Sequence, residues 1–106
     1  MGLKLSKRVI SYKTLRQFWE NKPAYRDVIE PARAWFQLTE AADRKSPAEV
    51  KFDLSNASIL KAGRIMFNLA KNKYRLVVWI NFPYRVVYIR FIGTHKQYDA
   101  IDAQTI

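Results

Sequence analysis

Hydrophobic positions change their period about halfway along the 106-residue chain. In the first half they recur every three or four residues, which predicts amphipathic helices over most of residues 11–53. In the second half they alternate with polar positions, which predicts three antiparallel strands, at 64–70, 74–81 and 86–92. A helical pattern returns over 94–103. Helices packed on one antiparallel sheet predict an α+β fold.

Local signals add shorter elements to this outline. Val9 and Ile10 predict a short strand over 8–11. Ser46 followed by Pro47, with Glu49 three residues after the serine, is a capping box that predicts a helix beginning at Pro47. Residues 56–63 show neither period and are interpreted as a loop. The clearest helix carries one broad apolar stripe, in which Thr39 is expected to bond back to a carbonyl: Val28, Ala32, Trp35, Phe36, Leu38 and Ala42.

The two predicted hairpins determine which side chains share a face of the sheet. A turn centred on Lys71–Asn72 places Asn68 opposite Arg75, and a turn centred on Pro83–Tyr84 places Arg90 diagonally from Arg75. One face is then wholly apolar, as expected of a face covered by helices: Ile65, Phe67, Leu69, Leu76, Val78, Ile80, Val87, Ile89 and Phe91. The other face has a mixed character: Arg64, Met66, Asn68, Arg75, Val77, Trp79, Tyr88, Arg90 and Ile92.

Two arginines in mid-strand, beside Trp79 and Tyr88, allow two interpretations of the mixed face. In the first, Arg75 and Arg90 lie along a half-exposed sheet with their heads in water. In the second, the face is a basic, aromatic surface that holds phosphates and stacks bases.

The segment after the last strand contains the chain's one histidine. Thr94 with Gln97 three residues later is another capping box, so we expect a helix that begins at His95. Free N–H groups at a helix start are typical of an anion site. Tyr98 and Asp99 share the face of His95. The alternative is that His95 is merely a polar residue in a first turn.

Composition narrows the classes of function. Nineteen Lys and Arg against nine Asp and Glu give a net charge of +10 and indicate a polyanionic partner: nucleic acid, an acidic membrane or an acidic protein. The absence of cysteine excludes disulfides, thiolate zinc sites and cysteine nucleophiles, and with one histidine we expect no metal and no cofactor. No stretch approaches the roughly 18 apolar residues of a membrane span, and no signal-peptide pattern is present. We therefore expect a cytoplasmic protein, without membrane contact, in which residues 1–106 form a single domain.

Two segments, 72–78 and 87–99, resemble the HigB family of bacterial toxins in the RelE-like superfamily of toxin–antitoxin ribonucleases. The first contains Tyr74–Arg75 and the second the turn Gly93–Thr94–His95, at the family's spacing. Segments at 8–11, 15–20, 46–51 and 57–60 resemble the family in the same order, so the resemblance covers nearly the whole chain. It implies a RelE-like fold: a small antiparallel sheet, N-terminal helices on one face and a short C-terminal helix.

The resemblance also implies an activity, namely endonucleolytic cleavage of mRNA to inhibit translation. In most relatives this occurs on the translating ribosome, in contact with 16S rRNA. A HigA-type antitoxin would neutralise the toxin, and DNA would be contacted only through the toxin–antitoxin complex. A cut without metal uses the neighbouring 2′-hydroxyl as nucleophile, and it needs a base, an acid and cations for the phosphate.

These requirements select the candidate residues. Arg75 and Arg90 can hold the phosphate. His95 is the candidate acid or base, because histidine titrates near neutrality, and Tyr98 is a second proton-transfer or base-stacking group. RelE relatives have an arginine near the position of His95 and a tyrosine about one turn past Tyr98, so the division of roles among His95, Tyr98 and Lys73 stays open. RNA contacts are expected from Asn68, Lys71, Asn72, Lys73, Trp79 and Lys96.

Two other functions use the same residues. A non-catalytic RNA-binding protein of ribosomal type would use the basic, aromatic face but would not need His95. An inactive toxin relative would act only with its antitoxin, as a DNA-binding repressor. An adjacent reading frame for a helix-turn-helix protein would favour either toxin interpretation over the ribosomal one.

Overall fold

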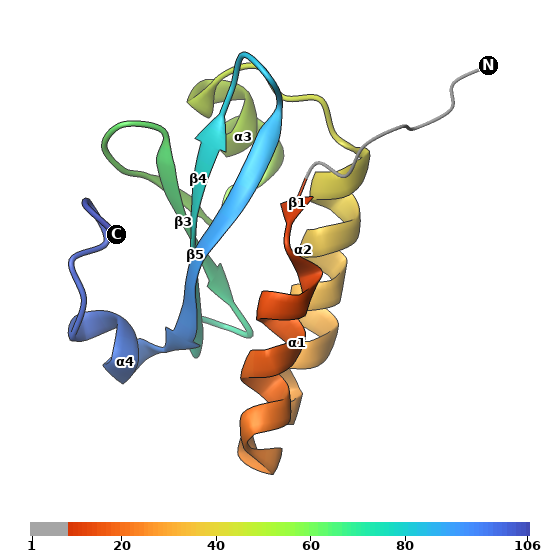
Figure 1. Ribbon diagram of the computed structural model, residues 1–106, viewed down its shortest axis with the longest axis vertical. Helices are drawn as coiled ribbons and strands as arrows, with labels where there is room; N and C mark the ends of the chain where they lie inside the picture. Colours follow the sequence, from red (N-terminus) through yellow and green to blue (C-terminus); the bar gives the residue numbers. More distant parts are fainter. Residues whose placement is uncertain (1–8) are drawn as a thin grey trace.

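The computed structural model of the protein describes residues 9–106. Within these residues, five strands form one sheet in the order β1-β5-β4-β3-β2, in which β1 is parallel to β5 and the other neighbours are antiparallel (Figure 1). The strands are β1 (Val9–Ile10), β2 (Ala57–Ile59), β3 (Arg64–Leu69), β4 (Tyr74–Asn81) and β5 (Val86–Thr94). The helices are α1 (Tyr12–Asn21), the 3₁₀ helix η1 (Pro23–Val28), α2 (Ile29–Ala41), α3 (Pro47–Asp53) and α4 (His95–Asp99). The α+β prediction is confirmed, and Arg8, the first residue of the expected opening strand, lies outside the described residues.

Helices α1 and α2 lie side by side on one face of the sheet (Figure 1). Leu15 of α1 and Ala32 of α2 are fully buried there, and the ring of Trp35 packs edge-on against Phe67 at 5.5 Å between centroids. Two details of the expected stripe on α2 are wrong. Leu38 is 54% exposed, and the buried hydroxyl of Thr39 has no hydrogen-bond partner.

Local capping explains why α3 begins where the sequence predicts. The Ser46 hydroxyl accepts a hydrogen bond from the Glu49 N–H, and Pro47 occupies the first helical position. The Glu49 carboxylate accepts from the Lys45 N–H rather than from Ser46, so the box is only half formed. Within the expected loop 56–63, the strand β2 was missed. Its three residues are too few to show a period, and they are strand because they pair with β3.

The sheet contains a β-bulge that the sequence analysis did not foresee. Trp79 pairs with Tyr88 as predicted. Between Val78 and Val77 the register shifts by one residue, because Arg90 is an extra residue in β5. A one-residue shift moves every following side chain to the other face. Phe91, expected under the helices, therefore packs on the opposite face, and Ile92 packs against the helix-covered core.

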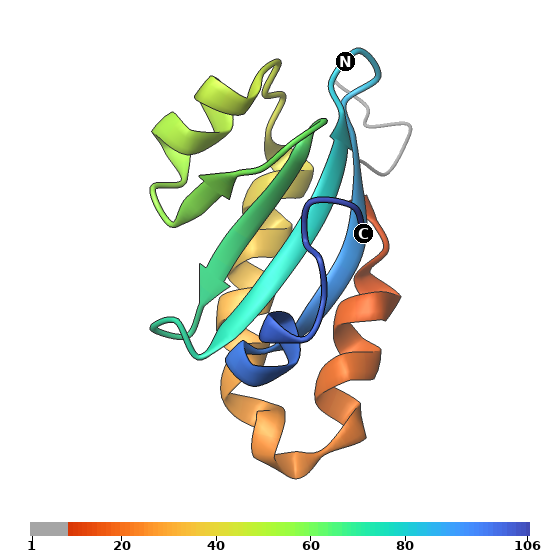
Figure 2. The same ribbon diagram turned by 90° about the vertical axis from the view of Figure 1, so that its left-hand side faces the viewer.

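The face opposite the helices is covered in its middle by the end of the chain (Figure 2). The helix expected over 94–103 is shorter in the structure. It ends at Asp99, the last residue of α4, and the chain then crosses the sheet. Ala103 is buried against Met66 and Val77, and Arg64 Nε donates to the Ile106 carbonyl at 2.8 Å. The expected open surface is thus divided into an end beside α4 and an end beside Trp79.

Candidate functional site

Arg75 of β4 and Tyr98 of α4 meet at the end of the sheet face beside α4. The guanidinium carbon of Arg75 lies 5.8 Å from the centroid of the Tyr98 ring, a cation–π distance. Arg75 Nη1 also donates to the Asn72 carbonyl at 2.7 Å. No carboxylate pairs with Arg75 in the part of the chain that the structure describes. Its charge is therefore held in place but not neutralised, as a phosphate-binding group requires.

The turn between β3 and β4 presents polar groups beside Arg75. Ala70, Lys71 and Asn72 are all in the left-handed region, with φ of 51°, 54° and 69°. This conformation is uncommon for residues other than glycine, and asparagine tolerates it best. It leaves the side chains of Lys71 and Asn72 exposed while the Asn72 carbonyl receives Arg75. Asn68, opposite Arg75 as predicted, has a buried Oδ1 with no hydrogen-bond partner.

His95 begins α4 as predicted, and both hydrogen bonds of the capping box are present. The Thr94 N–H donates to Gln97 Oε1 at 2.8 Å, and the Gln97 N–H donates to the Thr94 hydroxyl at 3.1 Å. His95 Nδ1 lies 3.2 Å from Asp99 Oδ2. A carboxylate at that distance favours a proton on Nδ1 and leaves Nε2 for a substrate. The five-residue α4 has only a small dipole, so an anion site at its start is not supported.

Lys73 has a partner that the sequence analysis missed. Its ammonium pairs with Asp27 Oδ2, while Oδ1 of the same carboxylate accepts from the Tyr74 hydroxyl. Burial, and then the bond to Asp27, raise the pKa of Tyr74 to about 12, and the bonds from Lys73 and Tyr74 lower the pKa of Asp27. RNA must therefore compete with Asp27 for Lys73. Asp27 lies 46 residues before Lys73, and no local pattern connects them.

The structure brings some of the predicted site residues together and separates others. Asn68, Asn72, Arg75 and Tyr98 are in contact or paired, and the Lys73 carbonyl accepts from the His95 N–H at 3.2 Å. Lys71 and Lys96 are exposed on the neighbouring turn and helix. Asp99, which the sequence placed on the His95 face without a role, joins the site as the partner of His95.

Arg90 and Trp79 lie away from this group. Arg75 pairs with Gly93, so Arg90 is three residues along β5 from that pair and is not the expected diagonal neighbour. Trp79 lies four residues along β4 from Arg75, about 13 Å at the usual strand rise. Its ring stacks on Tyr88 with centroids 5.3 Å apart. Trp79 is therefore outside the candidate catalytic site.

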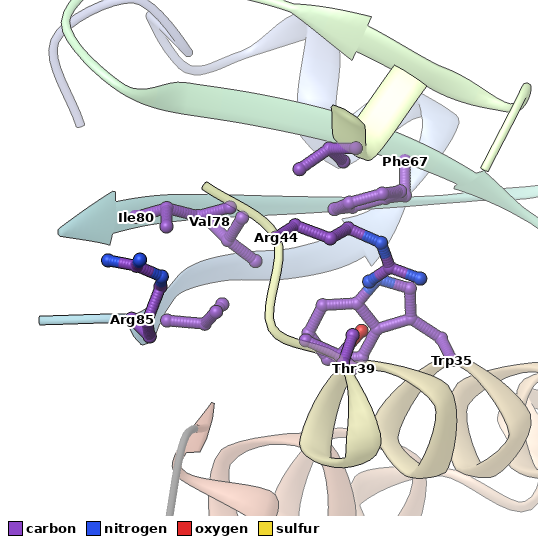
Figure 3. A pocket seen from close by; sticks show the side chains of 10 residues that line it. Trp35, Thr39, Arg44, Phe67, Val78, Ile80 and Arg85 are labelled. Atoms are coloured by element: carbon purple, nitrogen blue, oxygen red, sulfur yellow. The ribbon is translucent and has the colours of Figure 1, made fainter. Parts of the chain in front are cut away.

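A separate cavity lies between α2 and the helix-covered face (Figure 3). It measures about 30 Å³, the room of roughly one water molecule. Trp35 Nε1 and Thr39 Oγ1 are buried in its wall without hydrogen-bond partners, whereas Arg44 and Arg85 are paired with Asp53 and Asp43. This cavity is too small for a nucleotide.

Residues 9–106 contain neither a cluster of metal-ligating side chains nor a membrane-spanning helix. No three histidine, aspartate or glutamate side chains lie together as metal ligands would. No helix in the same range is long and apolar enough to cross a membrane.

Residues 29–101 match the HigB_toxin family model, described as the RelE-like toxic component of a toxin–antitoxin system. No curated protein matches the chain. The matched stretch contains Arg75, His95 and Tyr98; it begins after Asp27 and ends within the segment that crosses the sheet after α4. Because the match covers more than half of the sequence, the chain belongs to the HigB family of RelE-like toxins of toxin–antitoxin systems.

Proposed function

We propose that this protein is an endoribonuclease that cleaves mRNA without a metal ion and thereby inhibits translation. The observation that carries the proposal is the placement of Arg75, which no carboxylate pairs with among the described residues, over Tyr98 of α4. The same helix carries the His95–Asp99 pair. A net charge of +10 supports an RNA substrate, because counterion release drives the binding of basic proteins to nucleic acids.

The proposed reaction is a transfer within the RNA strand. The 2′-oxygen bonds to the adjacent phosphorus while the bond from phosphorus to the 5′-oxygen breaks, which gives a 2′,3′-cyclic phosphate and a free 5′-hydroxyl. The 2′-hydroxyl proton goes to a base, and the leaving 5′-oxygen receives a proton from an acid. His95, with Nδ1 directed at Asp99, offers Nε2 for either step.

Arg75 stabilises the charge that develops on the phosphate, because a planar guanidinium can donate two parallel hydrogen bonds to its oxygens. Tyr98, in contact with Arg75, stacks a base or transfers the second proton. Lys73 is a third candidate for proton transfer once it leaves Asp27. Arg90, displaced by the bulge, contacts a flanking phosphate rather than the scissile one.

Other predicted residues extend the RNA path. Lys71, Asn72 and Lys96 are exposed around Arg75 and are proposed to contact neighbouring phosphates. Asn68, half-buried opposite Arg75, is proposed to contact the RNA beside Arg75. Trp79, stacked on Tyr88, offers a ring for a base farther along the strand.

Membership of a toxin–antitoxin family implies an antitoxin partner. We propose that this antitoxin is of the HigA type, that cleavage takes place on the translating ribosome in the cytoplasm, and that DNA is bound only through the toxin–antitoxin complex.

Induced expression followed by primer extension on a known transcript tests the activity. New 5′ ends inside reading frames, absent when His95→Gln is expressed, are expected. Cleavage of a purified oligonucleotide to a cyclic phosphate identifies the chemistry. Tight RNA binding with no new ends would contradict the proposal and favour a non-catalytic RNA-binding protein.

A further inference from the structure

We propose that Asp27 is a positioning residue for the candidate site: it holds the start of β4, and the start of β4 holds His95. The inference rests on the proposed function and adds to it a residue that is not among the proposed RNA contacts and that lies outside the family match.

The two carboxylate oxygens of Asp27 contact two consecutive residues, one oxygen to each. Oδ1 accepts from the Tyr74 hydroxyl and Oδ2 pairs with the Lys73 ammonium. Asp27 is itself fixed, because η1 is anchored in the core by Tyr25 and the fully buried Val28. One carboxylate therefore ties the 3₁₀ helix to the first residue of β4 and to the turn residue before it.

Lys73, the last residue of the turn before β4, and Tyr74, the first residue of β4, also hold the start of α4. The Lys73 carbonyl accepts from the His95 N–H at 3.2 Å, and Tyr74 pairs with Thr94, the residue that caps α4. Gln97 of α4 also donates to the Tyr25 hydroxyl of η1, at 3.5 Å. A displacement of Lys73 and Tyr74 is thus transmitted directly to His95.

The two contacts of Asp27 contribute little to the stability of the fold, which distinguishes a positioning role from a purely structural one. The ring of Tyr74 is 1% exposed and packs edge-on against Phe18 and Tyr25, so the core is retained if its hydroxyl is removed. The Asp27–Lys73 pair is largely exposed, and such pairs contribute little to stability. Both contacts can therefore be changed without unfolding the protein.

The two contacts can also be removed one at a time. Asp27→Asn keeps an oxygen for Tyr74 but removes the negative charge that pairs with Lys73, whereas Tyr74→Phe keeps the ring and loses the hydroxyl. Asp43→Asn is the matched control, because Asp43 pairs with Arg85 at 3.1 Å beside the β4–β5 turn, at the other end of the sheet.

The single histidine supplies a readout that does not depend on activity, since its imidazole C–H protons give one set of NMR signals. We expect these signals to shift or broaden in Asp27→Asn and in Tyr74→Phe, and to match the wild type in Asp43→Asn. Single-turnover cleavage should fall about 10-fold in Asp27→Asn, because small misplacements of a catalytic group are costly. RNA binding should not weaken, because Lys73 is freed for phosphate. A merely structural role would instead lower binding and cleavage together.

Wild-type imidazole signals and cleavage rates in both variants would overturn the inference while leaving the proposed function intact. Absence of cleavage by the wild type would contradict the proposed function, and the NMR comparison would still decide the role of Asp27. If Asp27→Asn does not fold, Tyr74→Phe gives the same comparison.

Discussion

Gly93 of β5 lies directly against the ring of Phe91. A Cβ on Gly93 would be 2.5 Å from Phe91 Cζ and 2.7 Å from Gln97 Oε1, so any side chain there forces both groups to move. Gln97 Oε1 is the acceptor that closes the capping box on Thr94, and Gly93 is the strand partner of Arg75. The glycine therefore permits the close approach of β5 and α4 on which the site depends.

Gly93→Ala should accordingly disturb the site more than the fold. We expect the stability to fall by about 1 kcal/mol, the typical loss of a helix cap, and cleavage to fall by at least about 10-fold. Urea unfolding and single-turnover cleavage measure the two effects. An alanine variant with the wild-type cleavage rate would show that α4 does not need this contact.

Much of the region around Gly93 is predictable from the sequence, because its signals are local. The alternation of β4 gives its bounds, and Thr94 with Gln97 gives the start of α4. The bulge at Arg90 is not predictable in this way. Phe91 and Ile92 are both apolar, so the alternation fits either register, and the choice is made by packing against segments distant in sequence.

The same division applies to the candidate site. The sequence places Arg75 on the mixed sheet face and Tyr98 on the face of His95, but their contact depends on how α4 packs against the sheet. Asp27 could not be predicted, since its contacts to Lys73 and Tyr74 depend on how η1 packs. The crossing segment 100–106 covers Met66 and Val77 through similar long-range contacts.

Arg75 and Arg90 should differ when each is replaced by alanine. Arg75→Ala removes the cation held over Tyr98 and is expected to lower the cleavage rate by about 10²–10³-fold. Arg90→Ala should instead weaken RNA binding. The slope of the logarithm of the binding constant against the logarithm of salt concentration should become shallower by about one, because one phosphate contact is lost. Binding isotherms at several salt concentrations, with single-turnover rates, separate the two. If Arg75→Ala and Arg90→Ala lost cleavage equally at saturating RNA, Arg90 would be a catalytic residue.

Thr39→Val should stabilise the protein. The Thr39 hydroxyl is buried in the cavity of Figure 3 without a partner, and valine has nearly the same shape. Removing an unsatisfied buried hydroxyl is expected to raise the free energy of unfolding by roughly 1 kcal/mol. Urea denaturation measures the change. A loss of stability would contradict this and would indicate that a water molecule joins Thr39 to Trp35.

The pair Asp27–Tyr74 should make stability depend on alkaline pH. The pKa of Tyr74 is raised to about 12, from the usual value of about 10. The folded state therefore binds the phenol proton more tightly than the unfolded state, and this contribution is complete below about pH 10 and lost as pH rises towards about 12. Tyr74→Phe lacks the proton, so the difference in stability between wild type and variant should narrow over that interval. A constant difference would contradict the assignment.

His95→Gln tests the proposed chemistry most directly. Glutamine retains hydrogen-bonding capacity but cannot carry a proton at neutral pH. Cleavage should therefore fall by about 10²–10⁴-fold while RNA binding stays close to that of the wild type. Asp99→Asn is the companion variant, because it removes the charge 3.2 Å from Nδ1 but keeps the imidazole, and we expect a smaller loss.

Rates and affinities must come from the same preparations, because toxicity in cells does not separate binding from catalysis. Wild-type cleavage by His95→Gln would assign the proton transfer to Tyr98 or Lys73, and a parallel loss of binding would mean that His95 only positions a phosphate.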